Sequence, residues 1–481
     1  MTIESRVKGF VGDKTRDIVK EQIESIDINK IMPAKQPLFP TMHAKDKPDL
    51  RSIERHKRAE LQATFDLLEE EWKEQKRELP SDYGSMLEVS CRASECPMPL
   101  NMDVYSGGLC FQCIYCFAKL FEQSLYAAFY DNWELAKVRA SSKEYVTNEL
   151  EKILAGNCKG ELKKAIERRI PIRLGIRTED FIPVEKQKKV ALTALKTIHD
   201  HDYPMMINTK SVLLGEGEWF KQICEMGKNI AVHVTITHVD DKIARKIEMA
   251  APSSTERFKL VKQLNEVGIR AIPRIEPSMA YINITEEHLP QYVDACLEAG
   301  APHVTSDTYH YYAHNAGIRE NFYIQGFDYD QMFRATSEWQ LVGSLFLEKL
   351  GFKLQDAGIG HSTFNFHTIP YNSDDICCGV GDYFKDAGFN TFNTLSLARE
   401  IVKSGGRVGW ADILERKAES LNREIFMNSY VIWNKLKYSP WAMDWCGGVR
   451  AVGYDDKGIV YDYKEERLRR DYERLAEVYS K

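Results

Sequence analysis

The sequence has no excess of positive charge, since 65 lysines and arginines stand against 71 aspartates and glutamates, giving a net charge of −6. No global basic surface for nucleic acid or another polyanion is therefore expected, although a local basic groove is compatible with these numbers. No window approaches 18 uninterrupted apolar residues, and the segment Met1 to Glu4 begins no apolar signal sequence. We therefore expect a cytoplasmic protein that is neither secreted nor membrane-spanning.

Cysteine is also scarce, with 11 residues in 481, an odd number that cannot pair completely within one chain. A disulfide scaffold is excluded on this ground, and a reducing compartment is indicated. Internal repeats and low-complexity tracts are absent. Apolar residues make up 43% and charged residues 28%, which is ordinary for a globular protein and too apolar for a disordered one. The length indicates about three domains, or one large domain with extensions.

The pattern along the chain divides it into three parts. Residues 1–85 are charged and irregular, with one predicted surface helix over 51–78, where Leu61, Phe65, Leu68 and Trp72 recur at helical spacing. Residues 326–481 combine helices with aromatic-rich loops, and we expect a C-terminal α+β domain that covers the substrate. The helices predicted there span 337–350, 394–404 and 464–479.

Between these parts, residues 86–325 alternate short apolar runs with helix-length stretches. The predicted strands span 102–105, 172–176, 204–208, 230–236, 269–275 and 303–306, and the clearest helices span 184–199, 254–267 and 286–299. Apolar runs joined by helical crossovers are typical of parallel strands buried on both faces. Six such units are fewer than a complete eight-unit barrel needs, so an α/β fold with a partial (β/α)6 barrel is predicted. Functional residues then collect after the carboxyl ends of the strands.

Three cysteines, Cys110, Cys113 and Cys116, fall within seven residues directly after the first predicted strand. The Cys-x2-Cys-x2-Cys spacing is that of bacterial ferredoxins, and it can hold three corners of a [4Fe–4S] cluster. The ferredoxin pattern continues with Cys-Pro, but Leu120 and Phe121 stand there, so one iron lacks a local cysteine. A structural zinc site completed by Cys91, Cys96 or a histidine, and three unliganded core cysteines, are the alternatives.

Several motifs fall in the order found in one known family. They are Asn101 and Tyr105, Cys113 to Ala118, Gly175 to Glu185, Asn208 to Ser211, Val234 to Thr237, and Glu248 to Arg257 with Leu264 and Gly268. Together they resemble the spore photoproduct lyase-like branch of the radical S-adenosylmethionine (SAM) enzymes, across roughly residues 101 to 310. The family's first cysteine interval is one residue longer, and Leu109 occupies the position of its first cysteine.

The resemblance implies a [4Fe–4S] cluster on Cys110, Cys113 and Cys116 whose free iron binds SAM. Reductive cleavage of SAM then generates a radical that abstracts hydrogen from the substrate, with electrons supplied by a reductant such as flavodoxin or ferredoxin. The residues implied in cofactor binding are Tyr115 against the adenine, Lys210 and Arg274 at the SAM carboxylate, Thr235 at SAM or its ribose, and Thr178 and Glu179 at the amino or ribose groups. For these residues the structural alternatives are ordinary packing, a surface lysine, and an ion pair of Arg274 with Glu276 or Glu248.

Candidate catalytic residues lie further along the chain. Tyr309, with His310, follows the last predicted barrel strand and is a candidate substrate contact. The thiol of Cys377 or Cys378 is a candidate hydrogen-atom donor, as in spore photoproduct lyases. Cys377, Cys378 and Cys446 could instead hold a second cluster with Cys91 and Cys96, or serve as buried structural thiols.

The sequence therefore predicts a radical SAM enzyme acting on an unidentified substrate. A small molecule, a peptide and a modified nucleic acid are all open, as is the reaction class among lyases, transferases and oxidoreductases, because a fold does not fix a function. The alternative is a non-catalytic iron–sulfur electron-transfer or zinc-binding protein that uses the same cysteines.

Overall fold

A computed structural model describes the central part of the chain and parts of both ends. The described residues are 13–27, 87–90, 96–106, 111, 113–116, 139–309, 316–336, 341–363, 372–374, 376–384, 386–389, 408–409, 449–455, 458–467, 469–470 and 473. No helix within these ranges has both the length and the apolar character needed to cross a membrane.

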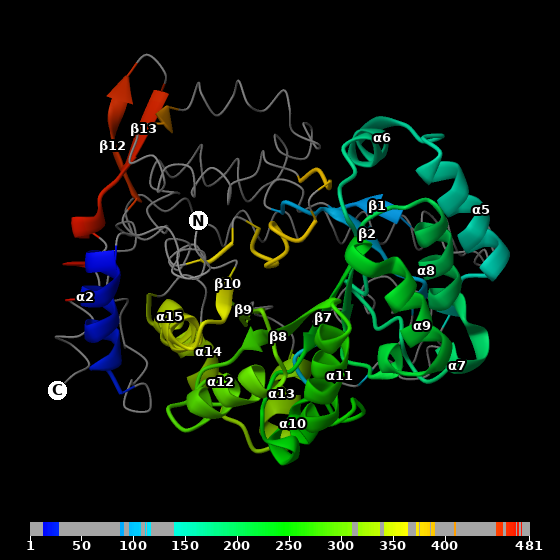
Figure 1. Ribbon diagram of the computed structural model, residues 1–481. Coiled ribbons are helices and arrows are strands. Elements are labelled where there is room, and N and C mark those ends of the chain that lie inside the picture. The colour runs from blue at the N-terminus through cyan, green and yellow to red at the C-terminus, as the bar shows by residue number, and fades with distance from the viewer. Residues whose placement is uncertain are drawn as a thin grey trace, which may run out of the picture.

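The body of the protein is an eight-stranded sheet (Figure 1). Its strands, in spatial order, are β1 (Leu87–Val89), β2 (Leu100–Met102), β5 (Ile172–Leu174), β6 (Met205–Thr209), β7 (Ile230–Thr235), β8 (Arg270–Ser278), β9 (His303–Thr308) and β10 (Gly360–Thr363). All neighbours from β2 to β10 are parallel, and β1 pairs with β2 in the antiparallel sense. Five of the six predicted strands are therefore confirmed in a mixed α/β fold, whereas the strand predicted over 102–105 shares only Met102 with β2. Strand β10 adds a seventh parallel strand.

Helices connect the parallel strands along the chain, and several of them pack against the outer face of the sheet, which holds the main apolar core. They are α5 (Lys143–Leu154), α6 (Gly160–Glu167), α7 (Glu185–Lys188), α8 (Val190–Asp200), α9 (Gly217–Met226), α10 (Asp241–Ile247), α11 (Ser254–Glu266), α12 (His288–Glu298), α13 (Ala316–Ile324), α14 (Tyr329–Thr336) and α15 (Leu341–Asp356). The predicted helix over 184–199 is split into α7 and α8, because Lys189 has a φ of 53°. The start of α11 is fixed by a capping box in which Ser253 and Glu256 bond reciprocally.

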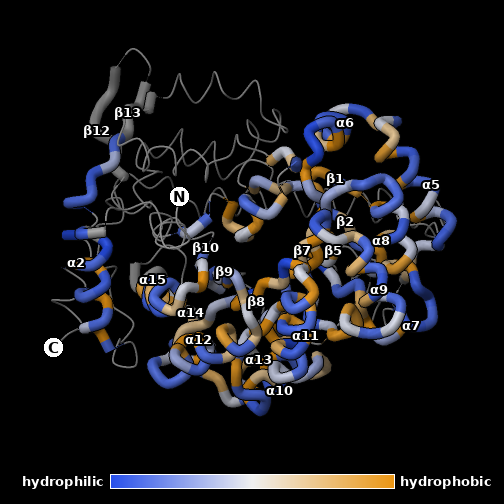
Figure 2. Tube along the Cα trace, in the orientation of Figure 1, coloured by the Kyte–Doolittle hydropathy of each residue, from blue (hydrophilic) through white to orange (hydrophobic). Residues whose placement is uncertain are grey.

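The two faces of the sheet differ in polarity because side chains alternate along each strand. Toward the helices, β7 presents Ile230, Val232 and Val234, which belong to the main apolar core. The opposite face, which we call the inner face, carries His233 and Thr235 of the same strand, and polar residues of the neighbouring strands. When the backbone is coloured by residue hydropathy, apolar residues are concentrated in the strands and on the helix faces turned toward them (Figure 2).

A segment from the C-terminal third, residues 376–384, lies across the inner face and is called the floor segment. Ile376, Val380 and Phe384 pack against side chains from the amino-terminal halves of the strands, namely Met206, Ala231 and Ile272. Several polar contacts hold it, including those from Arg270 Nε to Gly379 O at 2.8 Å, between His233 Nε2 and Cys378 O at 2.8 Å, and between Arg270 and Asp382 at 3.1 Å. The amino-terminal end of the inner face is therefore lined by apolar groups.

The predicted N-terminal extension contributes a helix to this body. Helix α2 (Asp13–Glu24) packs beside α15, and Arg16 hydrogen-bonds Gln355 at 3.3 Å. Lys349 of α15 donates to the carbonyl of Ile26 at 2.7 Å. The helix predicted over 51–78 lies outside the described residues.

The main sheet continues past residue 325, where we placed a domain boundary, because α14, α15 and β10 all follow it. The helix predicted over 337–350 corresponds to α15, which starts later and runs to Asp356. Beyond it, β11 (Val408–Gly409), β12 (Val449–Asp455) and β13 (Gly458–Tyr463) form a separate antiparallel sheet in the order β11-β13-β12. The helix predicted over 394–404, and most of that over 464–479, lie outside the described residues.

Candidate functional site

The cysteine loop lies against the segment that follows β7 and α10. Cys113 forms an isolated antiparallel bridge with Glu248, Ile114 N donates to Ile247 O at 3.0 Å, and Ala250 N donates to Phe111 O at 3.1 Å. The loop is thereby fixed at the carboxyl ends of the parallel strands, where α/β proteins carry their functional groups.

Two of the three clustered cysteines are described. Cys113 is buried, Cys116 is half-buried, and the amide of Cys116 donates to the carbonyl of Cys113 in a tight turn at 3.3 Å. Burial raises the pKa of the Cys113 thiol to about 12, with the positive charge of Lys210 acting in the opposite direction. A buried thiol of this kind ionises when a metal ion neutralises its charge, so the donor chemistry fits an iron–sulfur or zinc centre.

Cys110, the third member, lies outside the described residues. Within the described ranges, no group of three or more His, Cys, Asp or Glu side chains could hold a metal ion. The ligand set predicted from the sequence therefore stays a prediction, with two of its three members placed side by side.

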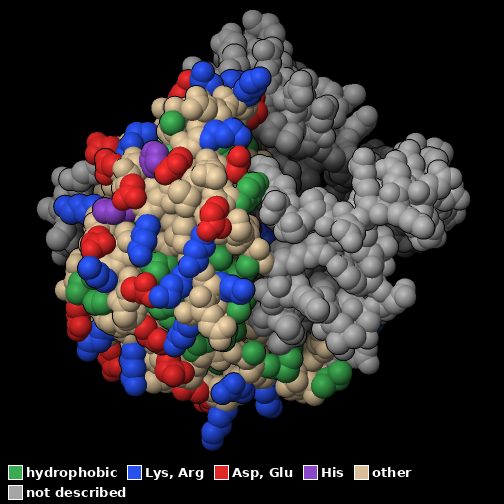
Figure 3. Space-filling model, turned by 90° about the vertical axis from the view of Figure 1, so that its right-hand side faces the viewer, with side chains coloured by type: hydrophobic (Ala, Val, Ile, Leu, Met, Phe, Trp, Pro, Cys, Tyr) green, Lys and Arg blue, Asp and Glu red, His purple; other side chains and the backbone are tan. Residues whose placement is uncertain are grey.

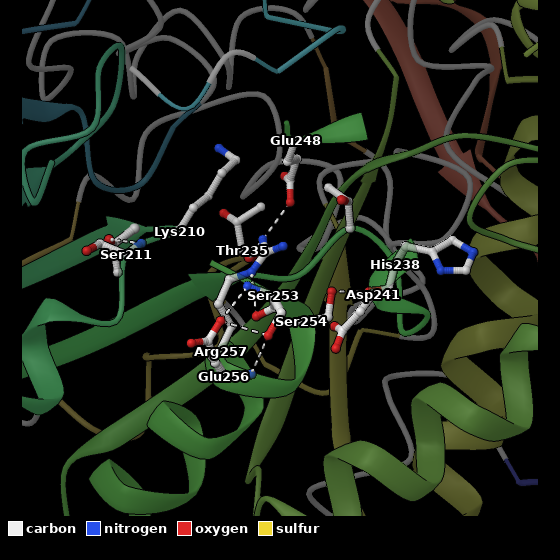
Figure 4. A network of polar contacts seen from close by, with 12 residues as sticks. Lys210, Ser211, Thr235, His238, Asp241, Glu248, Ser253, Ser254, Glu256 and Arg257 are labelled. Carbon is white, nitrogen blue, oxygen red and sulfur yellow. Dashed lines mark hydrogen bonds and ion pairs between the residues drawn. The ribbon is translucent and has the colours of Figure 1, made fainter. Parts of the chain in front are cut away.

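A network of buried polar contacts, centred on Glu248 and Arg257, connects the cysteine loop to the rest of the fold (Figure 4). The Tyr115 hydroxyl donates to Glu248 Oε1, and Glu248 Oε2 accepts from Arg257 Nη1 at 2.5 Å. Arg257 also donates to the carbonyl of Thr235 at 2.6 Å. Burial acts to raise the pKa of Glu248, but Arg257 and Lys210 hold it below its ordinary value. The carboxylate is therefore ionised and links β7, α11 and the cysteine loop.

Lys210 directly follows β6 and points toward the same loop, with its Nζ 5.9 Å from the centre of the Tyr115 ring. The neighbouring backbone is fixed by Glu179, which accepts from Lys210 N at 2.8 Å and from Thr209 Oγ1 at 2.6 Å. Tyr115 is thus both a packing residue and the immediate neighbour of a cation. Lys210 thus places a positive charge beside the cysteine loop, directly after β6.

The structure places Thr178 and Glu179 in protein contacts. Thr178 Oγ1 donates to Tyr105 O at 2.6 Å, and both oxygens of Glu179 accept from groups of this chain. Burial raises the pKa of Glu179, against the opposing effect of the Lys210 amide. These two residues organise the loop after β5, and their predicted cofactor contact stays a prediction.

Two aspartates that we did not single out connect this loop to the start of the cysteine region. Asp103 Oδ1 accepts from the amides of Ile176 and Arg177 at 3.0 and 3.1 Å, while Asp180 Oδ1 accepts from Val104 and Tyr105 at 2.8 and 3.2 Å. The predicted strand over 102–105 is consequently interrupted after β2, and Tyr105 begins the short β3 (Tyr105–Ser106), which pairs with β4 (Arg139–Ala140). Burial raises the pKa of Asp103 from 3.8 to about 6, and burial and Asp103 raise that of Asp180. Of the two, Asp180 follows a predicted strand, which is a signal available from the sequence, whereas Asp103 falls inside the strand predicted over 102–105.

Thr235 and Arg274 are paired in register on the inner face. Thr235 is buried, whereas the Arg274 side chain is 34% exposed and forms an ion pair with Glu276. Burial acts to lower the pKa of Arg274, but Glu276 raises it above the ordinary value. The ion pair expected as the structural alternative is therefore present, and the Arg274 side chain as a whole is only partly buried.

Tyr309, at the end of β9, is buried and makes edge-to-face contacts with Phe322 and Tyr329. This aromatic group belongs to the same apolar cluster as Ile114, with Tyr115 packed against it. Tyr309 thus lies behind the cysteine loop, and His310 lies outside the described residues.

The remaining cysteines are distributed around the floor segment. Cys378 packs with Cys96 in the apolar cluster of the floor, and Cys377 is packed against the main core. Cys378 therefore lies on the inner face below the level of Arg274, toward the amino-terminal ends of the strands. Cys91 and Cys446 lie outside the described residues.

Comparison with models of known protein families gives no match, and neither do the curated proteins. Among solved structures, the chain is similar to SuiB of Streptococcus suis bound to the precursor peptide SuiA, and to SuiB bound to SAM, with TM-scores of 0.31 and 0.32 at 16% and 15% identity. These matches cover 45% and 46% of this chain and 40% and 42% of SuiB. It is also similar to spore photoproduct lyase complexed with a dinucleoside spore photoproduct, with a TM-score of 0.36 and 14% identity over 52% of this chain and 67% of that chain.

Proposed function

We propose that this protein is a radical SAM enzyme. The observation that carries the proposal is the fixed position of the cysteine loop at the strand ends, with Cys113 and Cys116 beside Lys210 and with Tyr115 hydrogen-bonded to the buried Glu248. The family motifs resembled by the sequence include this loop and the segments that hold it.

In this proposal Cys110, Cys113 and Cys116 hold a [4Fe–4S] cluster as thiolates, and its fourth iron binds SAM. Such a cluster supplies the electron that cleaves the sulfonium of SAM, which starts hydrogen abstraction from the substrate. Lys210 then neutralises the SAM carboxylate as a point charge, and Arg274 is a second candidate for this role. Tyr115 packs against the adenine, while Thr235 hydrogen-bonds SAM or its ribose.

The other predicted roles follow from position. Cys378 lies on the inner face below Arg274, where a thiol can return a hydrogen atom to a substrate held above the floor segment. Tyr309, which the sequence predicts as a substrate contact, packs in the apolar cluster beside the cysteine loop, and the role that we propose for it is to position this loop. We further propose that a reductant such as flavodoxin or ferredoxin supplies the electron.

The substrate class among small molecules, peptides and modified nucleic acids is open. Figure 3 shows the face on which α5, α6, α8 and α9 lie, and acidic and basic side chains are interspersed over it. Many are paired along one helix, as in Lys164 with Glu161 and Lys152 with Glu149. This helical face therefore has no patch of one charge sign that would bind a polyanion, and it leaves the class of a substrate held on the inner face open.

The test is anaerobic reconstitution with iron and sulfide, followed by dithionite and SAM. We expect about four irons per chain and release of 5′-deoxyadenosine, with both lost in the Cys113→Ala and Cys116→Ala variants and kept in Cys224→Ala, whose thiol is exposed on α9. A reconstituted cluster that never cleaves SAM would indicate an electron-transfer protein. A colourless protein that binds one zinc ion would indicate a structural zinc site.

A further inference from the structure

Four residues on neighbouring parallel strands form a continuous row across the sheet. Thr235 of β7 is paired with Arg274 of β8, Arg274 with Thr305 of β9, and Thr305 with Ser362 of β10. Residues paired in this way point to the same side of a parallel sheet. The row therefore presents two hydroxyls beyond the two residues implicated in SAM binding.

The contacts of the adjacent residues show which side this is. Val304 belongs to the main core under the helices, and His361 faces α15 so closely that a Cβ on Gly351 would lie 2.5 Å from its ring. Ser306 Oγ bonds His361 Nε2 on that outer side at 2.7 Å. Because strand side chains alternate, Thr305 and Ser362 point to the inner face, as does the row.

The hydroxyls of Thr305 and Ser362 are buried, and among the described residues they make no hydrogen bond. Thr305 is 2% and Ser362 is 0% exposed, and neither Thr305 Oγ1 nor Ser362 Oγ has a hydrogen-bond partner in the part of the chain that the structure describes. Buried polar atoms are normally satisfied, and an unsatisfied one requires an explanation such as a bound ligand or water. Arg274, the neighbour of Thr305 in the row, has a partly exposed side chain, so the row reaches solvent at this position.

The charges near the row are already compensated. Arg274 is paired with Glu276, and Asp307 on the same face of β9 adds a second nearby carboxylate that raises the pKa of Arg274. Below the row, His233 is uncharged at neutral pH, because burial lowers its pKa to about 3. An additional charge beside Thr305 and Ser362 would have no unpaired opposite charge among these groups, which favours an uncharged ligand group.

We propose that Thr305 and Ser362 form a substrate subsite for an uncharged polar group, a carbonyl, amide or hydroxyl, held on the inner face above the apolar floor. This inference rests on the proposed function, since it assigns the subsite to the substrate of that reaction. The two hydroxyls donate hydrogen bonds to this group or accept them from it. The rest of the inner face contacts the remainder of the ligand.

The direct test uses small probes on the full chain. Crystals soaked in acetamide, sodium acetate or methylammonium chloride are compared at equal concentration. We expect acetamide alone within hydrogen-bond distance of Thr305 Oγ1 and Ser362 Oγ, and no acetamide there in the Thr305→Val/Ser362→Ala double variant. Preferential binding of acetate or methylammonium, or ordered water as the only occupant under all three soaks, would overturn the proposal.

Thermal melting supplies an independent readout. If the hydroxyls serve a ligand, the Thr305→Val/Ser362→Ala variant melts no lower than the wild type, because it removes two buried unsatisfied groups. The matched control is Ser306→Ala on the opposite face of the same strand, which leaves the buried His361 unpaired and melts lower by about 3 °C or more. A drop in the double variant as large as that of the control would show that the hydroxyls are structural.

These outcomes separate the subsite from the enzyme. Failure of the wild-type protein to release 5′-deoxyadenosine, together with acetamide bound at the row, would remove the proposed function and leave a polar binding site. SAM cleavage together with an empty row would leave the function and remove the subsite.

Discussion

Glu248 and Arg257 form an ion pair that the fold encloses almost completely, with side chains 0% and 1% exposed. Because Glu248 also accepts from Tyr115, the pair connects α11 to the cysteine loop. Replacing both partners of a buried ion pair by apolar residues changes the stability little. Removing only one partner is strongly destabilising, because the other charge is left buried without a counter-charge. The position of the Glu248–Arg257 pair indicates that it fixes the loop in place.

Replacing Arg257 by methionine should therefore be strongly destabilising, since Glu248 is left buried without its counter-charge. We expect a loss of about 3–5 kcal/mol in the free energy of unfolding, measured by urea denaturation. The control is Lys152→Met, which breaks the exposed pair with Glu149 and should cost less than about 1 kcal/mol. Equal losses of unfolding free energy in the two variants would contradict the conclusion that burial makes the Glu248–Arg257 pair costly to break.

Gly175 is required for close approach of two strand ends. It has a φ of 80°, and a Cβ there would lie 2.3 Å from the backbone oxygen of Asn208. We expect Gly175→Ala to lower the free energy of unfolding by about 3 kcal/mol or more, because a backbone atom cannot move aside cheaply. Gly156 has a similar φ of 82°, but a Cβ there would meet no atom within 4 Å. Gly156→Ala therefore measures the cost of the backbone conformation without a steric clash, and it should lower the free energy of unfolding by about 1 kcal/mol. Chemical denaturation of both variants checks the difference.

The paired aspartates make stability depend on pH. Since the pKa of Asp103 in the fold is about 6, above its ordinary 3.8, the fold favours the protonated form. Its contribution is complete below about pH 4 and is lost as the pH rises through about 6, by at most about 3 kcal/mol. Asp180, whose pKa is also raised, acts in the same direction.

The Asp103→Asn variant keeps an oxygen acceptor for the amides of Ile176 and Arg177 but does not titrate. We expect its stability to fall less than that of the wild type between pH 4.5 and pH 7, as followed by urea denaturation at several pH values. Parallel curves for the two proteins would rule out Asp103 as a source of the pH dependence.

Lys210 should control the affinity for SAM if the proposed function holds. Removing one charge-assisted contact in Lys210→Ala should raise the dissociation constant about 10- to 100-fold, measured by equilibrium dialysis with the reconstituted protein. Lys210→Arg keeps the charge and should lose less. The iron content of both variants provides the control, and unchanged SAM affinity in Lys210→Ala would place the cofactor carboxylate elsewhere.

Some features could be predicted because they depend on nearest neighbours in the chain. The strand over 230–236 and the helix over 254–267 are long and regular in pattern, and both are found almost as predicted. The strand predicted over 102–105 is misplaced, because β2 spans Leu100–Met102 and the backbone of Val104 instead donates to Asp180, 76 residues away in sequence. Likewise, the sequence pattern does not predict β10, because this strand has only four residues and is defined by its pairing with β9.

The sequence by itself determined the order of parallel strands and helices and the spacing of the three clustered cysteines, because periodicity and short intervals are local properties. Only the tertiary structure decided that Glu248 and Arg257 support the cysteine loop, that Cys378 lies beneath Arg274, and that Thr305 and Ser362 complete a row. These relationships arise from strand register and burial, which bring together residues that no local pattern connects.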